Sequence, residues 1–155
     1  MEEKYIHALL NGTINVLKTM ASTNPKPGKP YKKGDKKTLG DVSGIIGLTG
    51  AAKGAVVVSF SKACALKIVS TMLMEDYTEI NEEVKDAVGE ITNMISGDAR
   101  RNLEDLGMAF KAGIPTIIIG KCHEIKYKCS GPCYCFVIPF TCDGLEFFVE
   151  ASFEH

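Results

Sequence analysis

The feature that most constrains the fold is a helical segment, residues 77–107, that is apolar on one side only. Thr78, Asn81 and Glu82 offer a start for this helix, and Gly107 offers a stop. When each residue is advanced by about 100°, one set of apolar side chains falls within about 40° of a single direction. This stripe consists of Val84, Val88, Ile91 and Ile95. The segment therefore predicts a long helix that packs one face on a core.

The remaining patterns predict two helices before this segment and strands on both sides of it. Helical spacing recurs at 2–20 and 61–74, where Ser61 is a candidate N-cap. Strand patterns occupy 41–50 and 54–62, which suggest a hairpin, and then 115–129, 133–142 and 145–154. We predict one domain, residues 1–155: an α/β fold of the α+β type, with long helices packed on a largely antiparallel sheet. The apolar last strands, with Phe147, Phe148 and Val149, predict a sheet edge that needs a partner.

Charge and hydropathy exclude some classes of function. The formal net charge is -1, which gives no general attraction to nucleic acid or acidic lipid. The lysine-rich segment 24–37 can contact a polyanion, but its prolines and glycines favour a solvated loop. No stretch approaches the ~20 apolar residues of a membrane span. The acidic start "MEEKYIHALLNG" is unlike a signal peptide, so we expect a cytoplasmic protein in a bacterial host.

The cysteines allow two interpretations. The cluster "CSGPCYC" at 129–135 has C-x3-C-x-C spacing, and tetrahedral zinc would need a fourth ligand such as Cys142 or His123. Alternatively, "SGP" is a turn, and Cys133 and Cys135 alternate with other residues as in a strand. Reduced structural cysteines are favoured, and we expect no metal site.

A second set of residues lies on the side of the long helix opposite the apolar stripe. On the same wheel, these residues fall between about 160° and 240°. They are Asp86, Glu90, Asn93, Gly97 and Arg100. A solvated outer face explains such residues, but a mid-helix glycine costs up to ~1 kcal/mol relative to alanine. Either Gly97 provides clearance for an approaching protein, or Ser96-Gly97-Asp98 breaks the helix and Asp98 caps a new one.

The pattern Asp86-x3-Glu90-x2-Asn93, followed by Pro115 opening a strand, resembles the motif of the CheC/CheX/FliY family of chemotaxis phosphatases. "IIGLTGAAKGAVVVSFSKACALKIVSTML" and "GIPTIIIG" are similar to the hairpin, helix and strand around that motif, so the likeness spans about residues 40–120. The 21 residues between Asn93 and Pro115 are one fewer than the family spacing. The first helix lacks a second Glu/Asn pair, because Ala8 precedes Asn11 and Gly12 precedes Asn15. A single pair favours the CheX branch.

The resemblance implies a CheC-like fold and hydrolysis of the aspartyl phosphate of phosphorylated CheY or another receiver domain. Asn93 would position the attacking water, and Glu90 would engage a cation such as a lysine of the partner. Asp86, Gly97 and Arg100 would contact the partner, and Pro115 would have a structural role. The Mg²⁺ would belong to CheY, so no cofactor of the chain's own is expected. A homodimer is also expected. The alternative is a non-catalytic module that binds a receiver or a flagellar-switch component with the same face.

Overall fold

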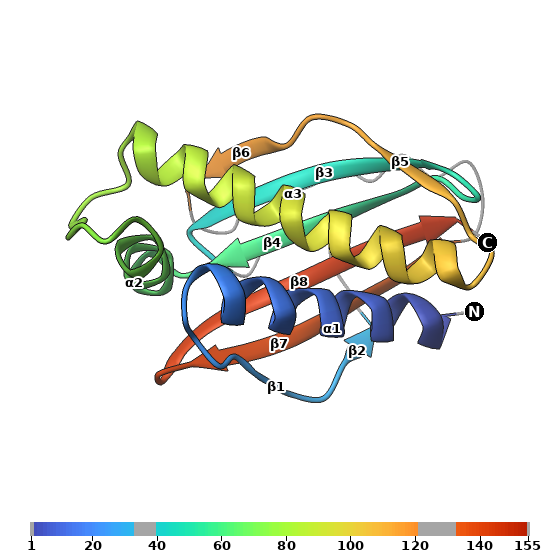
Figure 1. Ribbon diagram of the computed structural model, residues 1–155, viewed down its shortest axis with the longest axis horizontal. Coiled ribbons are helices and arrows are strands. Elements are labelled where there is room, and N and C mark those ends of the chain that lie inside the picture. Colours follow the sequence, from blue (N-terminus) through green and yellow to red (C-terminus); the bar gives the residue numbers. More distant parts are fainter. Residues whose placement is uncertain (1, 33–39, 121–132, 155) are drawn as a thin grey trace.

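The computed structural model describes residues 2–32, 40–120 and 133–154, and it shows one antiparallel sheet with helices on one face (Figure 1). The helices are α1 (Glu2–Met20), α2 (Lys62–Leu73) and α3 (Glu82–Asp105). The strands are β1 (Lys26–Pro27), β2 (Tyr31–Lys32), β3 (Val42–Gly50), β4 (Gly54–Phe60), β5 (Phe110–Ala112), β6 (Thr116–Ile119), β7 (Cys133–Cys142) and β8 (Leu145–Glu154). Their order is β1-β7-β8-β4-β3-β5, with β2 beside β7 and β6 beside β3.

The helix layer consists mainly of α1 and α3, which lie side by side across the sheet (Figure 1). α3 crosses β3 and β4, whereas α1 crosses β8 and β7. Aromatic rings fill the space between the layers: Phe147 stacks on Phe60 and on Phe140, with ring centroids 5.3 and 5.0 Å apart. Tyr5 of α1 stacks on Phe153 of β8 at 4.0 Å. Burial of these large rings helps to hold the helix layer on the sheet.

The strongly patterned elements are confirmed. The expected helix at 2–20 is α1, and the hairpin is the pair β3–β4, with Val42 opposite Phe60. Ser61 caps α2 by accepting a hydrogen bond from the Cys64 N–H at 3.2 Å. β7 and β8 are joined at Asp143-Gly144, where both residues have positive φ, 51° and 79°. These angles are those of the tight hairpin turn that an Asp-Gly pair predicts.

The prediction of a sheet edge at β8 is wrong. β8 lies between β7 and β4, with Val149 opposite both Ile138 and Val58, and Phe147 and Val149 are fully buried. These side chains are apolar because β8 is a central strand. The outer strands among the described residues are β5 and β6 on one side, and β1 and β2 on the other.

The lysine-rich segment differs from a simple solvated loop in the part that the structure describes. Lys26 and Pro27 pair with Thr141 and Phe140, and Tyr31 pairs with Val137, so two short strands lie along the outside of β7.

The prediction also missed strand β5. This strand continues into β6 along β3, and the extra residue of a bulge at 113–115 separates the two. None of the described helices has the length and hydropathy that crossing a membrane requires.

Candidate functional site

The candidate site lies on α3, whose two ends are both capped. At the start, Asn81 Oδ1 accepts a hydrogen bond from the Val84 N–H at 3.0 Å. At the end, Gly107 has φ 86°, its N–H donates to Glu104 O at 2.9 Å, and the Met108 N–H donates to Leu103 O at 2.9 Å. This pair of bonds is a Schellman motif, as Gly107 predicted. The helix is continuous between these caps, so a break at 96–98 is excluded.

Two glycines allow α3 to lie close to its neighbours. Gly44 of β3 faces Thr92, and a Cβ at Gly44 would overlap the Thr92 hydroxyl oxygen. Gly12 of α1 faces the α3 backbone, and a Cβ there would lie 3.2 Å from Ile95 O. α3 is therefore held by close backbone contacts on the sheet side and on the α1 side, which fixes the position of Asn93, the residue after Thr92.

The outer face of α3 presents the predicted acid and amide residues to solvent. Asp86, Glu90 and Asn93 are exposed, whereas all four residues of the predicted apolar stripe are fully buried. Glu90 and Asn93 are three residues apart, about 4.5 Å along the helix axis, so their side chains leave neighbouring positions on one face. Within the described part of the chain, neither side chain makes a hydrogen bond or an ion pair. Both groups are therefore available to a molecule that docks on this face.

Gly97 and Arg100 extend this face toward the C-terminal end of α3. Gly97 is partly exposed, and a Cβ there would lie no closer than 3.7 Å to another side-chain atom, Arg100 Nη2. Arg100 is partly buried, and its Nε has no hydrogen-bond partner among the described residues. Arg101 instead forms an ion pair with Asp98 at 3.5 Å. A positively charged region therefore follows the Glu90–Asn93 pair along the helix.

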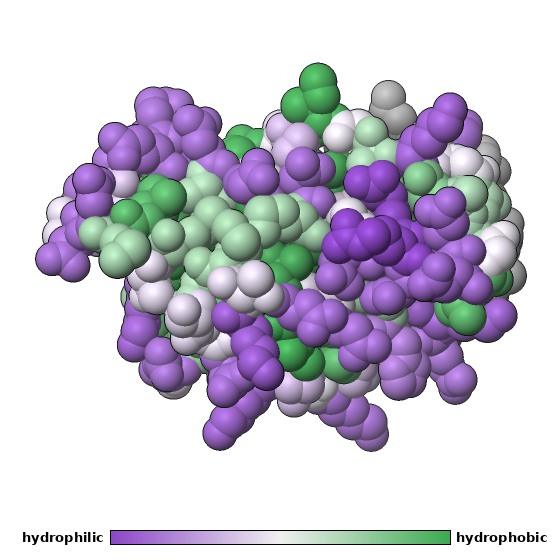
Figure 2. All heavy atoms as spheres, viewed as in Figure 1, coloured by the Kyte–Doolittle hydropathy of each residue, from purple (hydrophilic) through white to green (hydrophobic). Residues whose placement is uncertain are grey.

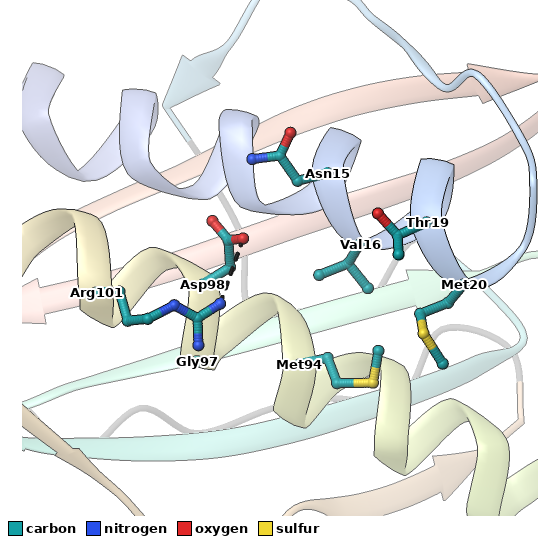
Figure 3. A pocket seen from close by; sticks show the side chains of 8 residues that line it. All are labelled: Asn15, Val16, Thr19, Met20, Met94, Gly97, Asp98 and Arg101. Carbon is teal, nitrogen blue, oxygen red and sulfur yellow. Dashed lines mark ion pairs between the residues drawn. The ribbon is translucent and has the colours of Figure 1, made fainter.

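A groove between α1 and α3 adjoins this face, and the sequence did not predict it. It is open to solvent and has a volume of about 260 Å³, and its lining includes Gly97 (Figure 3). Val16 and Met20 contribute from α1, and Met94 contributes from α3. Its only sequence signal is the pair of helical glycines, Gly12 and Gly97. We refer to it as the α1–α3 groove.

Pro115 lies at the bulge between β5 and β6, directly before Thr116. β6 pairs with β3 on one side only, so an N–H missing at this position removes no interior ladder bond. Ile117 of β6 packs below Gly89, 3.5 Å from where a Cβ at Gly89 would lie. The strand that follows Pro115 thus supports α3 directly beside Glu90.

The cysteine cluster at 129–135 lies mostly outside the described residues. Among the residues that are described, no group of three His, Cys, Asp or Glu side chains could hold a metal ion. Cys64 and Cys142 are buried thiols that form no disulfide. Burial, with a smaller contribution from nearby Cys142, raises the pKa of Cys64 to about 12. This pKa keeps Cys64 a neutral thiol, a poor metal ligand.

A family model and a sequence relative both indicate the CheX phosphatases. The family model described as "Chemotaxis phosphatase CheX" matches residues 42–141, which is more than half of the chain. The "CheY-P phosphatase CheX" of Thermotoga maritima is 32% identical over 128 residues, which cover 81% of this chain and 82% of that protein.

Solved structures agree with the fold. The crystal structure of a chemotaxis protein CheX from Desulfovibrio desulfuricans has a TM-score of 0.88 and 42% identity, covering 97% of this chain and 99% of that one. A CheX–CheY–BeF3–Mg²⁺ complex from Borrelia burgdorferi has a TM-score of 0.83 and 26% identity, covering 97% and 98%. The likeness thus extends over α1 and β8 as well as the residues that match the family model.

Proposed function

The chain belongs to the CheX family of chemotaxis phosphatases, and we propose that it hydrolyses the aspartyl phosphate of phosphorylated CheY or a related receiver domain. The observation that carries the proposal is the exposed Glu90–Asn93 pair, which has no side-chain partner among the described residues, in the middle of a helix capped at both ends. A receiver-domain substrate implies action in the cytoplasm. The Mg²⁺ of the reaction belongs to the substrate, and the related complex with CheY contains Mg²⁺.

Asn93 would orient the attacking water. An aspartyl phosphate is an acyl phosphate and is already activated, so alignment of water for in-line attack is a large part of the barrier. The Asn93 amide can accept from a water and donate to a neighbouring oxygen, and it carries no charge that would repel the phosphoryl oxygens. Because α3 is held on two sides by Gly44 and Gly12, the helix backbone that carries Asn93 would already be in place when the receiver arrives.

Glu90 would bind a cation of the receiver, such as a lysine beside the phosphorylated aspartate. A carboxylate directed at the phosphoryl group would oppose its negative charge, whereas a charge-assisted hydrogen bond to a lysine stabilises the docked complex. With Glu90 one turn before Asn93, that bond would hold the amide over the phosphoryl group. Asp86, one further turn away and also exposed, and Arg100 would contact the rim of the receiver.

The test is release of phosphate from a phosphorylated receiver domain. Asn93→Ala should reduce the accelerated rate by ~10²-fold or more, and Asn93→Asp should do the same although it preserves the shape. Asn24→Ala, which removes an exposed amide near β1, is the matched control and should retain the wild-type rate. Equal decay of the phosphorylated receiver with wild type and with Asn93→Ala would contradict the proposal. Binding without faster phosphate release would instead support the non-catalytic module.

Glu90→Gln separates docking from chemistry, because it keeps the shape of the side chain and removes its charge. We expect KM to rise by about tenfold, the loss of one charge-assisted hydrogen bond. A KM equal to that of wild type would exclude the cation-binding role.

The expected homodimer stays a prediction. A dimer would have to use a surface other than the buried face of β8. Analytical ultracentrifugation of the same samples measures the oligomeric state.

A further inference from the structure

The α1–α3 groove has one mainly apolar end and one polar end (Figure 3). At the mainly apolar end, Met20 and Met94 extend toward each other from facing helices, beside Val16 and the hydroxyl of Thr19. Met20, the last residue of α1, is 39% exposed, so part of its side chain is accessible from solvent. Methionine is flexible and polarizable, so this pair can adapt to apolar groups of different shapes.

The polar end is already neutralised within the chain. The Asp98 carboxylate accepts a hydrogen bond from Asn102 Nδ2 at 3.2 Å and pairs with Arg101 at 3.5 Å. A charged ligand would have to break these interactions to bind there. At the mainly apolar end, no ion pair involves a lining residue within the described part of the chain, so the groove is suited to an apolar side chain with its polar attachment toward Asp98 and Arg101.

Gly97 keeps the groove open on the α3 side. A Cβ at Gly97 would meet only ordinary contacts, 3.7 Å to Arg100 Nη2 and 3.9 Å to Arg101 Nη1, so the fold itself tolerates alanine. Alanine would also favour the helix. Neither core packing nor backbone φ requires glycine at this position; its structural consequence is the depth of the groove.

The groove is continuous with the proposed docking face. Gly97 follows Asn93 by four residues, about 6 Å along the axis and about 40° around it, so both lie on one side of α3. A domain that covers Asn93 therefore also covers the mouth of the groove. On the same side of the molecule, apolar surface gathers over α2 and the adjoining half of α3 (Figure 2), where Leu73 and Met74 are 40% and 90% exposed.

We propose that the α1–α3 groove receives an apolar side chain of the docked receiver domain, and that this contact selects the receiver independently of the chemistry at Asn93. The proposal rests on the proposed function, since the receiver is the domain that covers Asn93. The occupant is a single apolar side chain from the rim of the receiver's phosphorylated surface. Gly97 and the two methionines are then specificity-determining residues, and they do not touch the reacting atoms.

The experiment is steady-state phosphate release with a phosphorylated CheY-type receiver as the varied substrate. Gly97→Leu fills the groove with a good helix former, and we expect KM to rise by about tenfold or more, with a much smaller change in kcat. Met94→Ala should raise KM by several-fold. Two controls should keep KM within about twofold: Met72→Ala, a methionine on α2 outside the groove, and Glu104→Leu, an added leucine farther along α3.

Each outcome decides a separate point. If Gly97→Leu has the KM and kcat of wild type while Asn93→Ala loses activity, the groove proposal is wrong and the proposed function stands. A fall in kcat alone would also overturn it, because the groove would then act on the chemistry. If wild type binds the receiver without accelerating phosphate release, the proposed function fails, and the dissociation constant of Gly97→Leu still decides the groove: a tenfold increase supports it, and no change refutes it.

Discussion

The contact between Gly44 on β3 and Thr92 on α3 sets how closely the helix lies on the sheet. In Gly44→Ala, the new methyl group would overlap Thr92 Oγ1 and lie 3.0 Å from Thr92 Cβ. Thr92 cannot turn away easily, since it is fully buried and its hydroxyl donates to Val88 O at 2.8 Å. α3 must therefore move outward. Overpacking of this kind costs ~1–3 kcal/mol, offset by up to ~1 kcal/mol because alanine is better than glycine within a strand.

We expect a net loss of about 1.5 kcal/mol in the free energy of unfolding, the difference between the midpoints of these two ranges. Urea unfolding followed by circular dichroism measures it as a lower midpoint with an unchanged m-value. The outward movement should also lower kcat for phosphate release, because Asn93 is attached to the displaced Thr92.

A second variant keeps this reasoning open to refutation. Thr92→Ala alone removes a buried methyl group and one hydrogen bond, at a cost of about 1–2 kcal/mol. In the double variant Gly44→Ala/Thr92→Ala, the added methyl group occupies the space that the hydroxyl left. The double variant should therefore lose at least ~1 kcal/mol less unfolding free energy than the two single variants lose together. It should also recover kcat. Additivity within ~0.5 kcal/mol, the range for independent sites, would show that Gly44 does not set the height of α3.

Three further predictions concern the helix cap, the groove and the buried thiol. Asn81→Ala removes the N-cap of α3 and should lower stability by ~1 kcal/mol in thermal melts, whereas Asn24→Ala should not. Gly97→Ala should raise stability by up to ~1 kcal/mol and should also raise KM for the receiver. Lower stability together with an unchanged or lower KM would contradict the open-groove explanation. Because burial raises the pKa of Cys64 to about 12 from its usual 9.0, the unfolded chain releases this proton first, and stability should fall as pH rises from 9 toward 12. Urea midpoints should fall more steeply over that window in wild type than in Cys64→Ala.

The elements that the sequence predicted well are those whose period is set by local burial. α1, β7 and β8 repeat their apolar residues over ten or more positions, and the structure has them within the predicted bounds. β1 and β2 are two residues long and have no period to detect, so they form only because β7 offers them a partner. The position of β8 was missed for a related reason. An apolar strand pattern reports burial, but which strands lie on either side of it is decided by contacts far apart in the sequence.

The candidate site also has one part that the sequence predicted and one part that it did not. The exposure of Glu90 and Asn93 follows from one helical wheel, because it depends only on the period of α3 and the direction of its apolar stripe. The α1–α3 groove depends on the packing of two helices separated by more than 60 residues of chain, so a wheel cannot reveal it. Of the residues that line the groove, the sequence pointed to Gly97 as unusual, since a glycine on an outer helix face lowers helix stability and no core packing requires it.

The separation between a rigid amide and an adaptable groove suggests how one fold can serve different receivers. Asn93 lies on a helix with caps at both ends and close contacts at Gly44 and Gly12, so we expect its backbone position to change little when surface residues change. Every receiver presents the same aspartyl phosphate, so this part of the site can discriminate little among receivers. Discrimination must come from side chains around the phosphorylated surface, and the methionine-lined end of the groove is flexible where α3 is rigid. Substitutions at Met20 and Met94 should therefore change the order of preference among receivers while the rate of the chemical step stays constant.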